Sequence, residues 1–416
     1  MFIGVFTPNS MGVPKMEWAR VKNRFREKGY KPRLKECRHD YWRVQLTRDK
    51  RFKYHCPACR TPRLRIKRTR FAHARDEPFG LRTRVEITYP AVTAYCPICE
   101  MHMTLRPLMI HPTAQATRRY MAFISSMCQD QPAQAVADKF GHSATTVCEW
   151  DKHVLQSTLP PPNLNRLRVL LVDEKTVRRR HRYVTVVMNG ETRELLFMQE
   201  GKKKDTLLAF INRLKTRQKA SIQAVGMDRA GAYLAAVREG LPHAAVVFDK
   251  FHIIQNLNRA LNEVRCDEYQ KALKSKSSVA HLIKGQRFNL YRLAENRTEA
   301  QSLRLRELLD ANQNLSTAHL LAEQLRLLWE YQHRGYAERY LREWALWVEE
   351  SQRVPMIRFA RGLWRDREHI LSYIRYGITT GPLEALNGSI ERILRRACGM
   401  RDLEYLYLKI RQESVK

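Results

Sequence analysis

Three acidic residues stand at points where the sequence changes character. Asp173 and Asp228 each follow a short apolar run, and Glu384 lies just inside the start of a helical pattern. A carboxylate at the tip of a buried strand adds no packing energy, and a buried charge without a partner is costly. Carboxylate oxygens are, however, the ligands that Mg²⁺ prefers. The placement of these acids therefore indicates a site for divalent cations.

The elements around the acids follow a definite order. The second strand-like run ends in Asn189-Gly190, a strong signal for a hairpin. Helical patterns separate the third, fourth and fifth runs. The runs cover 168–177, 182–190, 194–201, 222–228 and 244–252. This order of three antiparallel strands, helix, strand, helix and strand matches the ribonuclease H-like fold, in which the first and fourth strands are parallel neighbours. The tips of those two strands bring Asp173 and Asp228 side by side.

A third carboxylate would complete a two-metal site for phosphodiester cleavage, since neighbouring carboxylates are costly without a cation between them. Glu384 is the first choice, because Pro382 is tolerated in a first helical turn and Glu384 then lies at the edge where a metal site can form. Glu391, two turns further on, is the fallback. Glu174 is expected on the opposite sheet face, and Asp249 is ranked as an accessory or structural acid. The alternative for each acid taken alone is an ordinary solvated carboxylate.

Two Cys-x-x-Cys knuckles form a separate candidate metal site. Cys56 and Cys59 make one knuckle, and Cys96 and Cys99 make the other. The spacing lets both sulfurs of a knuckle reach one ion, and four thiolates close a tetrahedral site around a structural Zn²⁺. Four unrelated buried thiols are the alternative. A redox pair is disfavoured because no βαβ pattern surrounds either knuckle.

The segment 63–75, between the knuckles, carries five Arg and one Lys. Beside a zinc knuckle such a run favours contact with phosphates, and a solvated charged face is the alternative. Within it we expect DNA contacts at positions 64, 67 and 70, which are Leu64, Lys67 and Arg70.

Residues 131–150 have the spacing of a helix-turn-helix. Ala137 is small enough for a tight helix crossing, Gly141 falls in the turn, and Ser143 can cap a second helix beginning near Ala144. A structural helical pair has the same spacing and is the alternative. If the second helix enters the major groove, DNA contacts are expected from Ser143, Thr145, Thr146 and Lys152.

The composition favours nucleic acid as the partner. The chain has 416 residues, and a hydrophobic fraction of 44% is enough for several packed domains. It carries 75 Lys and Arg against 42 Asp and Glu, a formal net charge of +33 that raises affinity for polyanions. No apolar run approaches the roughly 20 residues of a membrane-spanning helix, so we expect a cytoplasmic, nucleoid-associated protein. Nine cysteines fit reduced thiols and metal ligation better than a disulfide framework.

The pattern divides the chain into four predicted regions. Residues 1–112 form a zinc-binding module and residues 113–156 a helix-turn-helix domain. A catalytic α/β domain spans 167–252 and 371–416, and an all-helical insertion, 253–370, interrupts it. The expected fold class is therefore multi-domain α+β. The tryptophans of the insertion stand at helical spacing and are expected mainly in its core: Trp329, Trp344, Trp347 and Trp364.

Taken together, these residues resemble a family of bacterial insertion-sequence transposases, the ISL group (ISL-three type), whose members are DDE enzymes. The resemblance is carried by VDEKTV, GMDRAGAY, VFDKFHIIQNLNRALNEVR and GPLEALNGSIERILRRACGMRDLEYL. It implies that Asp173, Asp228 and Glu384 are catalytic and hold two Mg²⁺ ions, with Mn²⁺ able to substitute. Asp249 and His252 match the family's D-x-F-H element, which lies next to the site.

The resemblance also implies an activity. Such an enzyme binds the terminal inverted repeats of its element as a dimer on double-stranded DNA, and it cleaves and transfers strands without a covalent protein–DNA intermediate. Ala385 replaces the family's Gly after the catalytic Glu, and Arg395 and Arg396 remain as basic DNA-contact candidates in the last segment. Two other interpretations fit the residues: a non-catalytic DNA-binding regulator, and a structure-selective nuclease on the same fold.

Overall fold

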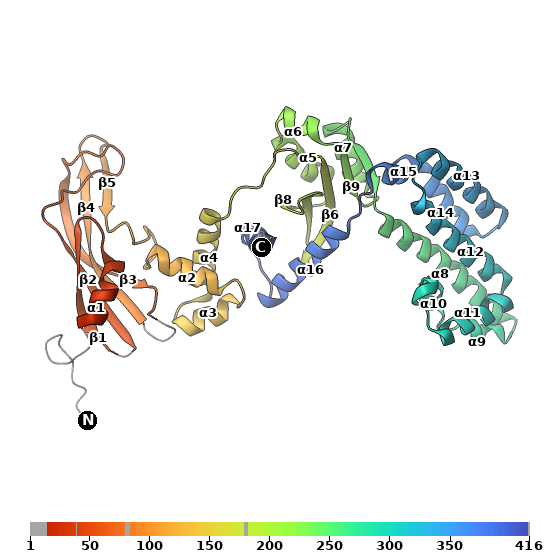
Figure 1. Ribbon diagram of the computed structural model, residues 1–416, viewed down its shortest axis with the longest axis horizontal. Helices are drawn as coiled ribbons and strands as arrows, with labels where there is room; N and C mark the ends of the chain where they lie inside the picture. The colour runs from red at the N-terminus through yellow and green to blue at the C-terminus, as the bar shows by residue number, and fades with distance from the viewer. Residues whose placement is uncertain (1–14, 39, 80–83, 179–181, 415–416) are drawn as a thin grey trace, which may run out of the picture. The chain divides into compact units, whose positions relative to one another are not determined.

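The structure, a computed structural model, describes residues 15–38, 40–79, 84–178 and 182–414 (Figure 1). The apolar start of the chain lies outside these ranges. The chain forms two compact units, Met1–Leu159 and Pro160–Lys416. No helix in the described ranges has both the length and the apolar composition needed to cross a bilayer.

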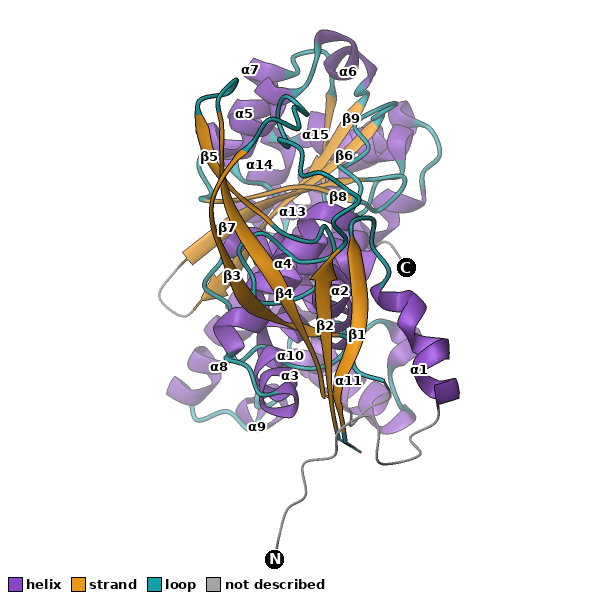
Figure 2. Cartoon of the chain, turned by 90° about the vertical axis from the view of Figure 1, so that its left-hand side faces the viewer, coloured by secondary structure: helices purple, strands orange, loops and turns teal. Residues whose placement is uncertain are grey.

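The first unit begins with a helix, α1 (Lys15–Lys22), a short 3-10 turn, η1 (Asn23–Phe25), and a twisted five-stranded sheet (Figure 2). The strand order is β1-β2-β4-β3, and β5 pairs with β4 beside β2. Alternate residues of β2 and β4, such as Val44 and Ile87, are fully buried. The strands are β1 (Tyr30–Cys37), β2 (Tyr41–Arg48), β3 (Arg65–Asp76), β4 (Arg84–Cys96) and β5 (Met101–Leu105).

Three helices complete the first unit: α2 (Arg118–Met127), α3 (Ala133–Phe140) and α4 (Ala144–Thr158). Gly141 ends α3 with φ 69°, a left-handed conformation that glycine adopts without steric cost. The Ser143 side chain accepts the N–H of Thr146 and caps α4. Ala137 and Val147 are fully buried in the small core between the helices. The two helices, the turn at Gly141 and the cap at Ser143 therefore lie where the sequence predicts them.

The second unit is built on a mixed sheet of order β10-β9-β6-β7-β8. The strands β6, β7 and β8 follow one another in the chain and pair antiparallel. β9 pairs parallel to β6, and β10 pairs parallel to β9. This is the order and direction predicted from the sequence, including the turn after Asn189. The strands are β6 (Val169–Arg178), β7 (Arg182–Asn189), β8 (Leu195–Glu200), β9 (Ala224–Met227) and β10 (Ala245–Phe248).

Helices cover both faces of this sheet, because alternate residues of a strand point to opposite faces. Leu170 and Val172 of β6 pack with α5 and α7, and Leu171 packs with α16 and α17. The helices are α5 (Lys204–Arg213), α6 (Thr216–Ser221), α7 (Gly231–Gly240), α16 (Gly381–Arg396) and α17 (Leu403–Ser414).

The segment that leads into α16 packs closely against the sheet at Gly226. A Cβ added at Gly226 in β9 would lie 2.7 Å from Ile378 Cγ2 and 2.8 Å from Leu171 Cδ2. Only glycine leaves room for the Ile378 side chain against the sheet at this point. The start of α16 is thereby fixed next to the parallel strands.

Two strand ends differ from the sequence prediction. β6 ends at Arg178, one residue beyond the predicted run 168–177, so Asp173 lies within the strand and not at its tip. β10 ends at Phe248 instead of 252, since Asp249 caps a helix that begins at Lys250. The sequence had placed His252 at a strand end, but it lies in the first turn of that helix.

The insertion is entirely helical in its described residues, as predicted. Trp344 is fully buried and donates its Nε1–H to the carbonyl of Leu321 at 2.8 Å, and Trp329 is also buried. Trp364 is half-buried, and Trp347 is 42% exposed, so Trp347 is not a core residue. The helices are α8 (Lys250–Lys274), α9 (Val279–Ile283), α10 (Arg287–Tyr291), α11 (Glu299–Ala311), α12 (Gln313–Arg326), α13 (Arg334–Glu350), α14 (Val354–Arg365) and α15 (Arg367–Tyr376), with 3-10 turns η2 (Ala294–Asn296) and η3 (Leu327–Glu330).

Acidic pH should lower the stability of the three-helix module formed by α2, α3 and α4. The ring of His142 lies 2.8 Å from the Tyr120 hydroxyl, and burial, with Arg75 and Arg84 adding, lowers the pKa of His142 to about 4. The folded-state pKa is thus below the unfolded value of about 6.5, so this contribution to stability is complete above pH 6.5 and is lost as the pH falls towards 4. His142→Gln should reduce the drop in the thermal midpoint over that window.

The control is the exposed His281. His281→Gln should leave the pH profile of the thermal midpoint as it is in the wild type. A profile that is equally steep with and without His142 would contradict the assignment.

Candidate active site

Asp173 and Asp228 lie on neighbouring parallel strands. The register of β6 and β9 pairs Val172 with Met227, so the next residue on each strand is one of the two aspartates. Asp173 is half-buried within β6, and Asp228 is half-buried directly after β9. The predicted pairing of these two acids is therefore present in the sheet.

Backbone donors hold both carboxylates in place. Asp173 Oδ1 accepts the N–H of Glu174 at 2.8 Å, and Asp228 Oδ1 accepts the N–H of Arg229 at 2.5 Å. His252 Nδ1 lies 3.8 Å from Asp228 Oδ2. Burial raises the pKa of Asp173, and the neighbouring Asp228 raises it further, while hydrogen bonds and His252 act in the opposite direction. A nearby cation would offset this cost of ionisation.

Asn387 is a site residue that the sequence did not single out. Its Nδ2 donates to Asp173 Oδ2 at 2.8 Å, which ties α16 to β6. Its Oδ1 is buried and has no hydrogen-bond partner among the described residues. A buried acceptor without a partner is costly, and a bound ion at this position would satisfy it. The local signal was its position, three residues after Glu384 on the same helical face.

Glu384 lies in the first turn of α16, as predicted, and is exposed. It is one turn before Asn387, on the side of the helix that meets β6. Among the described residues, its carboxylate does not form a cluster with those of Asp173 and Asp228 in which all ligand atoms lie within 4.8 Å. The structure thus brings two of the three predicted acids together and leaves the third at the rim.

Glu391, the fallback acid, already forms ion pairs within the protein. Glu391 Oε1 accepts from Lys175 Nζ at 2.6 Å, and Arg395 lies 3.7 Å from its other oxygen. The Lys175 pair lowers the pKa of Glu391. Glu391 therefore fastens α16 to β6, and its charge is compensated within the protein, whereas that of Glu384 is available.

Asp249 connects two helices that contribute to the site. It is 3% exposed, and its Oδ1 accepts the N–H of Thr380 at 3.3 Å. Its Oδ2 accepts the N–H of His252 at 3.4 Å in the first turn of α8. Thr380 directly precedes α16, so a single buried carboxylate joins the start of α8 to the start of α16. Asp249 thereby orients both His252 and Glu384.

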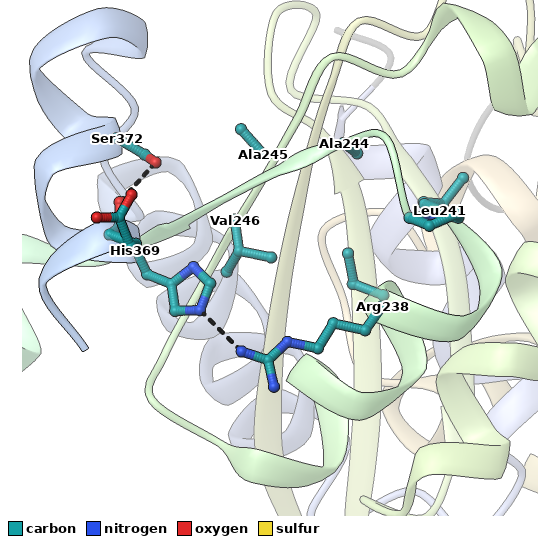
Figure 3. A pocket seen from close by; sticks show the side chains of 10 residues that line it. Arg238, Leu241, Ala244, Ala245, Val246, His369 and Ser372 are labelled. Carbon is teal, nitrogen blue, oxygen red and sulfur yellow. Dashed lines mark hydrogen bonds between the residues drawn. The ribbon is translucent and has the colours of Figure 1, made fainter. Parts of the chain in front are cut away.

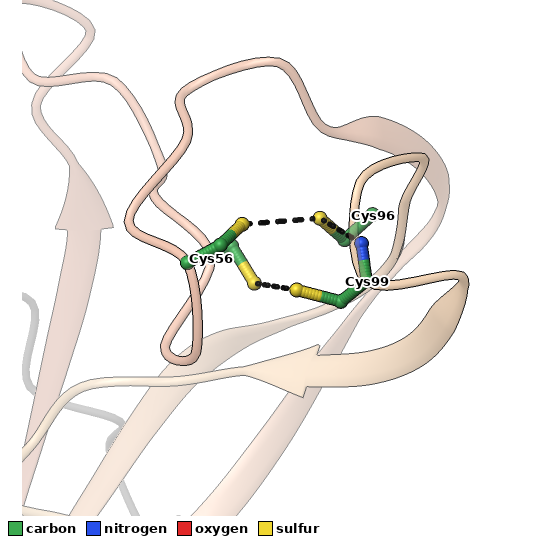
Figure 4. Close-up of side chains that lie close together, drawn as sticks. Cys56, Cys96 and Cys99 are labelled. Carbon is green, nitrogen blue, oxygen red and sulfur yellow. Dashed lines mark hydrogen bonds between the residues drawn. The ribbon is translucent and has the colours of Figure 1, made fainter.

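The four knuckle cysteines form a compact cluster in the first unit (Figure 4). Cys56 Sγ lies 3.8 Å from Cys99 Sγ, and Cys59 Sγ lies 3.6 Å from Cys96 Sγ. A tetrahedron with Zn–S bonds of about 2.3 Å has edges of about 3.8 Å. Four protein ligands leave no open position, so the donor set fits a structural Zn²⁺.

The two knuckles repeat one backbone design. Arg60 and Glu100, each directly after the second cysteine, have φ values of 59° and 54°. The Cys59 backbone N–H lowers the pKa of Cys56 to about 7, whereas the hydrogen bond with Cys59 raises the pKa of Cys99 to about 12. Four close thiols cannot all ionise by themselves, so the cluster needs a cation to bind as thiolates.

A protein-family model, described as a transposase of the ISL3-type DDE group, matches residues 170–410. The chain belongs to the ISL3-type insertion-sequence transposases. It is 31% identical over 357 residues to the transposase for insertion sequence element IS1001 of Bordetella parapertussis, covering 86% of this chain and 87% of the relative. It is 27% identical over 260 residues to the transposase for IS1557 of Mycobacterium tuberculosis, covering 58% of each chain.

Several predicted DNA-contact residues of this transposase are exposed. β3 is an edge strand, and its residues 65–71 are exposed on both faces, including Lys67 and Arg70. Leu64 was a wrong choice, because it carries no charge and packs half-buried against Val92, Ala94 and Leu105. The exposed part of β3 offers positive charge to a polyanion.

The predicted DNA-contact residues on the helices of this transposase differ in how exposed their side chains are. Ser143 and Thr145 are exposed at the start of α4, and Thr146 and Lys152 are half-buried. The Arg395 side chain is 84% exposed. Arg396 is bound to Glu413 of α17 at 3.1 Å and serves to join the two helices.

A separate hollow of about 250 Å³ lies in this transposase at the amino-terminal end of β10 (Figure 3). It is bordered by the end of α7, the start of β10 and α15, and Arg238 donates to His369 Nε2 at 3.4 Å beside it. The acids stand at the other ends of the parallel strands. This hollow is therefore not part of the acid site.

Zinc removal should unfold the knuckle region. The purified transposase should contain about one zinc per chain by elemental analysis, since the four sulfurs form one closed site. Cys56→Ser or Cys96→Ser should abolish the bound zinc and lower the thermal midpoint. Cys398→Ser, at an exposed cysteine outside the cluster, is the matched control and should keep the metal. Undiminished zinc in Cys56→Ser would refute the site.

Loss of the Asp249 carboxylate should loosen the junction of α8 and α16. Asp249→Ala leaves two N–H groups without their charged acceptor, which costs about 2–3 kcal/mol of unfolding free energy. Asp267→Ala, at an exposed position of α8, is the control. Hydrogen exchange should accelerate at 380–388 in the Asp249 variant and not in the control. Unchanged exchange there would show that Asp249 does not position α16.

Proposed function

We propose that this transposase binds the terminal inverted repeats of its insertion sequence and catalyses metal-dependent DNA cleavage and strand transfer. The catalytic residues are Asp173, Asp228 and Glu384. The observation that carries the proposal is the juxtaposition of Asp173 and Asp228 on adjacent parallel strands, with Asn387 bonded to Asp173. This placement has an electrostatic cost, which cations held by the carboxylates would offset.

The residues fit two Mg²⁺ ions, with Mn²⁺ as a substitute. The donors are all oxygens, as these hard cations require. Asp173 and Asp228 supply neighbouring carboxylates, the buried Asn387 Oδ1 has no other partner among the described residues, and Glu384 is an uncommitted acid one turn away. When bound, the ions would activate water or a 3′-hydroxyl and stabilise the leaving oxygen.

The protein's own residues position this chemistry. Asn387 donates to Asp173 and fixes one carboxylate oxygen against β6. The Glu174 and Arg229 backbone N–H groups orient one oxygen on each aspartate. Asp249 sets the start of α16 and with it the reach of Glu384. In this proposal no serine or tyrosine acts as a nucleophile.

The remaining regions would hold DNA and arrange the complex. We propose residues 167–252 and 371–416 as a ribonuclease H-like catalytic domain, interrupted by the insertion 253–370. Residues 1–112, with structural zinc, and 113–156 would grip double-stranded DNA. The exposed β3 and the helix-turn-helix geometry support these roles. Two ends must be joined, so a dimer on DNA is expected, in the cytoplasm at the nucleoid.

Neutralising the proposed acids should abolish cleavage and spare DNA binding. Asp173→Asn, Asp228→Asn and Glu384→Gln each remove a charge needed to hold a cation, and activity should fall by at least about 100-fold. The assay is cutting and joining of labelled terminal-repeat DNA with Mg²⁺, beside a gel-shift measurement of binding.

The matched control is Glu391→Gln on the same helix. Its carboxylate is already paired with Lys175, so cleavage should persist. Strand transfer at the wild-type rate by any of the three acid variants would refute the proposal. Cleavage without joined products would favour a structure-selective nuclease, and DNA binding without cleavage by the wild type would favour a regulator.

A further inference from the structure

A hollow of about 290 Å³ lies between α8 and α14. Three of its lining residues are arginines: Arg229, Arg259 and Arg358. Asn256 and Glu263 also line it, and Phe359 contributes apolar surface. None of the chemistry assigned to the acids uses this hollow, which we call the α8–α14 basic pocket (Arg229, Asn256, Arg259 and Arg358).

Two connections link the basic pocket to the acid site. Arg229 directly follows Asp228, and its guanidinium donates to Asp366 Oδ2 and to the carbonyl of Gly362, each at 3.0 Å. On α8, His252, Asn256 and Arg259 follow at intervals of four and three residues, so they share one face of the helix. His252 lies beside Asp228, whereas Asn256 and Arg259 line the pocket.

Helical geometry gives the scale of this path. From His252 to Arg259 the helix rises roughly 10 Å, at about 1.5 Å per residue. One DNA strand advances about 3.4 Å per nucleotide along the duplex axis. For a DNA strand that runs along α8, this rise places the basic pocket about three nucleotides from the phosphodiester that the acids would hold.

The charges in the pocket suit an anion. Arg259 is exposed, donates to Asn256 Oδ1 at 3.1 Å, and has no acidic partner among the described residues. The Arg358 side chain is 72% exposed and lies 3.4 Å from Glu263, which is itself 44% exposed. An ion pair this exposed is weak and exchanges readily for a better acceptor. Arginine presents a planar fork of donors that matches phosphate oxygens.

We propose that the α8–α14 basic pocket binds a backbone phosphate of the DNA strand, about three nucleotides from the phosphodiester that is cut. Arg259 and Arg358 contact the phosphate oxygens, and Asn256 holds Arg259 in place. Arg229, fixed by Asp366, keeps the pocket in register with Asp228. The distance to the cut rests on the proposed function, but phosphate binding by the pocket does not.

The test is the salt dependence of DNA binding by the full chain. The probe is a fluorescein-labelled duplex of about 30 base pairs of arbitrary sequence, without Mg²⁺, because phosphate contacts are independent of sequence. The double variant R259A/R358A should weaken binding and reduce the slope of log K against log[salt] by about one, the loss of one phosphate contact. R259K/R358K should restore most of the slope.

The matched control is R361A. Arg361 is on the same helix as Arg358, is also 72% exposed, and is paired with Glu349 at 2.9 Å, outside the pocket. The slope should remain that of the wild type. An equal loss in R361A would show that any exposed arginine has this effect, and an unchanged slope in R259A/R358A would remove the pocket from the DNA path. Either result overturns the proposal.

The location is tested separately on terminal-repeat DNA with one uncharged methylphosphonate placed at each phosphate near the cut. Wild-type binding should weaken at a position about three nucleotides from the cut, and R259A/R358A should no longer respond there. A response shared by both proteins at every position would overturn the placement. None of these measurements requires cleavage. A failure of the acid assignment would therefore leave the binding results valid, and the two failures can be distinguished.

Discussion

The repulsion between two carboxylates on adjacent strands is the constraint that the rest of the site accommodates. The register of β6 and β9 places Asp173 and Asp228 next to each other in the backbone. Each carboxylate is oriented by the N–H of the following residue, and each has a second polar neighbour on a helix, Asn387 or His252. The surrounding protein therefore holds two like charges close together, an electrostatic cost that bound cations would offset.

The connections that maintain this arrangement span long stretches of sequence. Asp249 bonds to Thr380 across the whole insertion, and Arg229 bonds to Asp366 in the last part of it. Both contacts involve charged groups with little exposure, where hydrogen bonds contribute more than at the surface. The Arg229–Asp366 contact thus ties the insertion to the residue after Asp228, and the insertion shares a packed core with the sheet.

Much of the second unit could be predicted from the sequence, because strand-like runs and turn signals are local. The order of β6 to β10, the start of α16 and the pairing of the two aspartates follow from such patterns. The end of β10 could not be located in the same way, because Asp249 caps α8 and the strand stops at Phe248. Asn387 and Asp249 act through contacts with distant residues, which leave no periodic signal. For residues 1–112 the sequence predicts a zinc-binding module but not its sheet, since exposed arginines obscure the alternation of buried residues such as Val44 and Ile87.

The buried core that runs without a break from β6 into α13 and α14 has a mechanical consequence. Close-packed interiors have low compressibility and pass strain on to their neighbours. The hydrogen bond from the Arg229 guanidinium to the carbonyl of Gly362 joins α14 to the residue that follows Asp228, so strain in α14 is passed on to the carboxyl end of β9. Strain in the insertion and the spacing of the two carboxylates are therefore mechanically coupled.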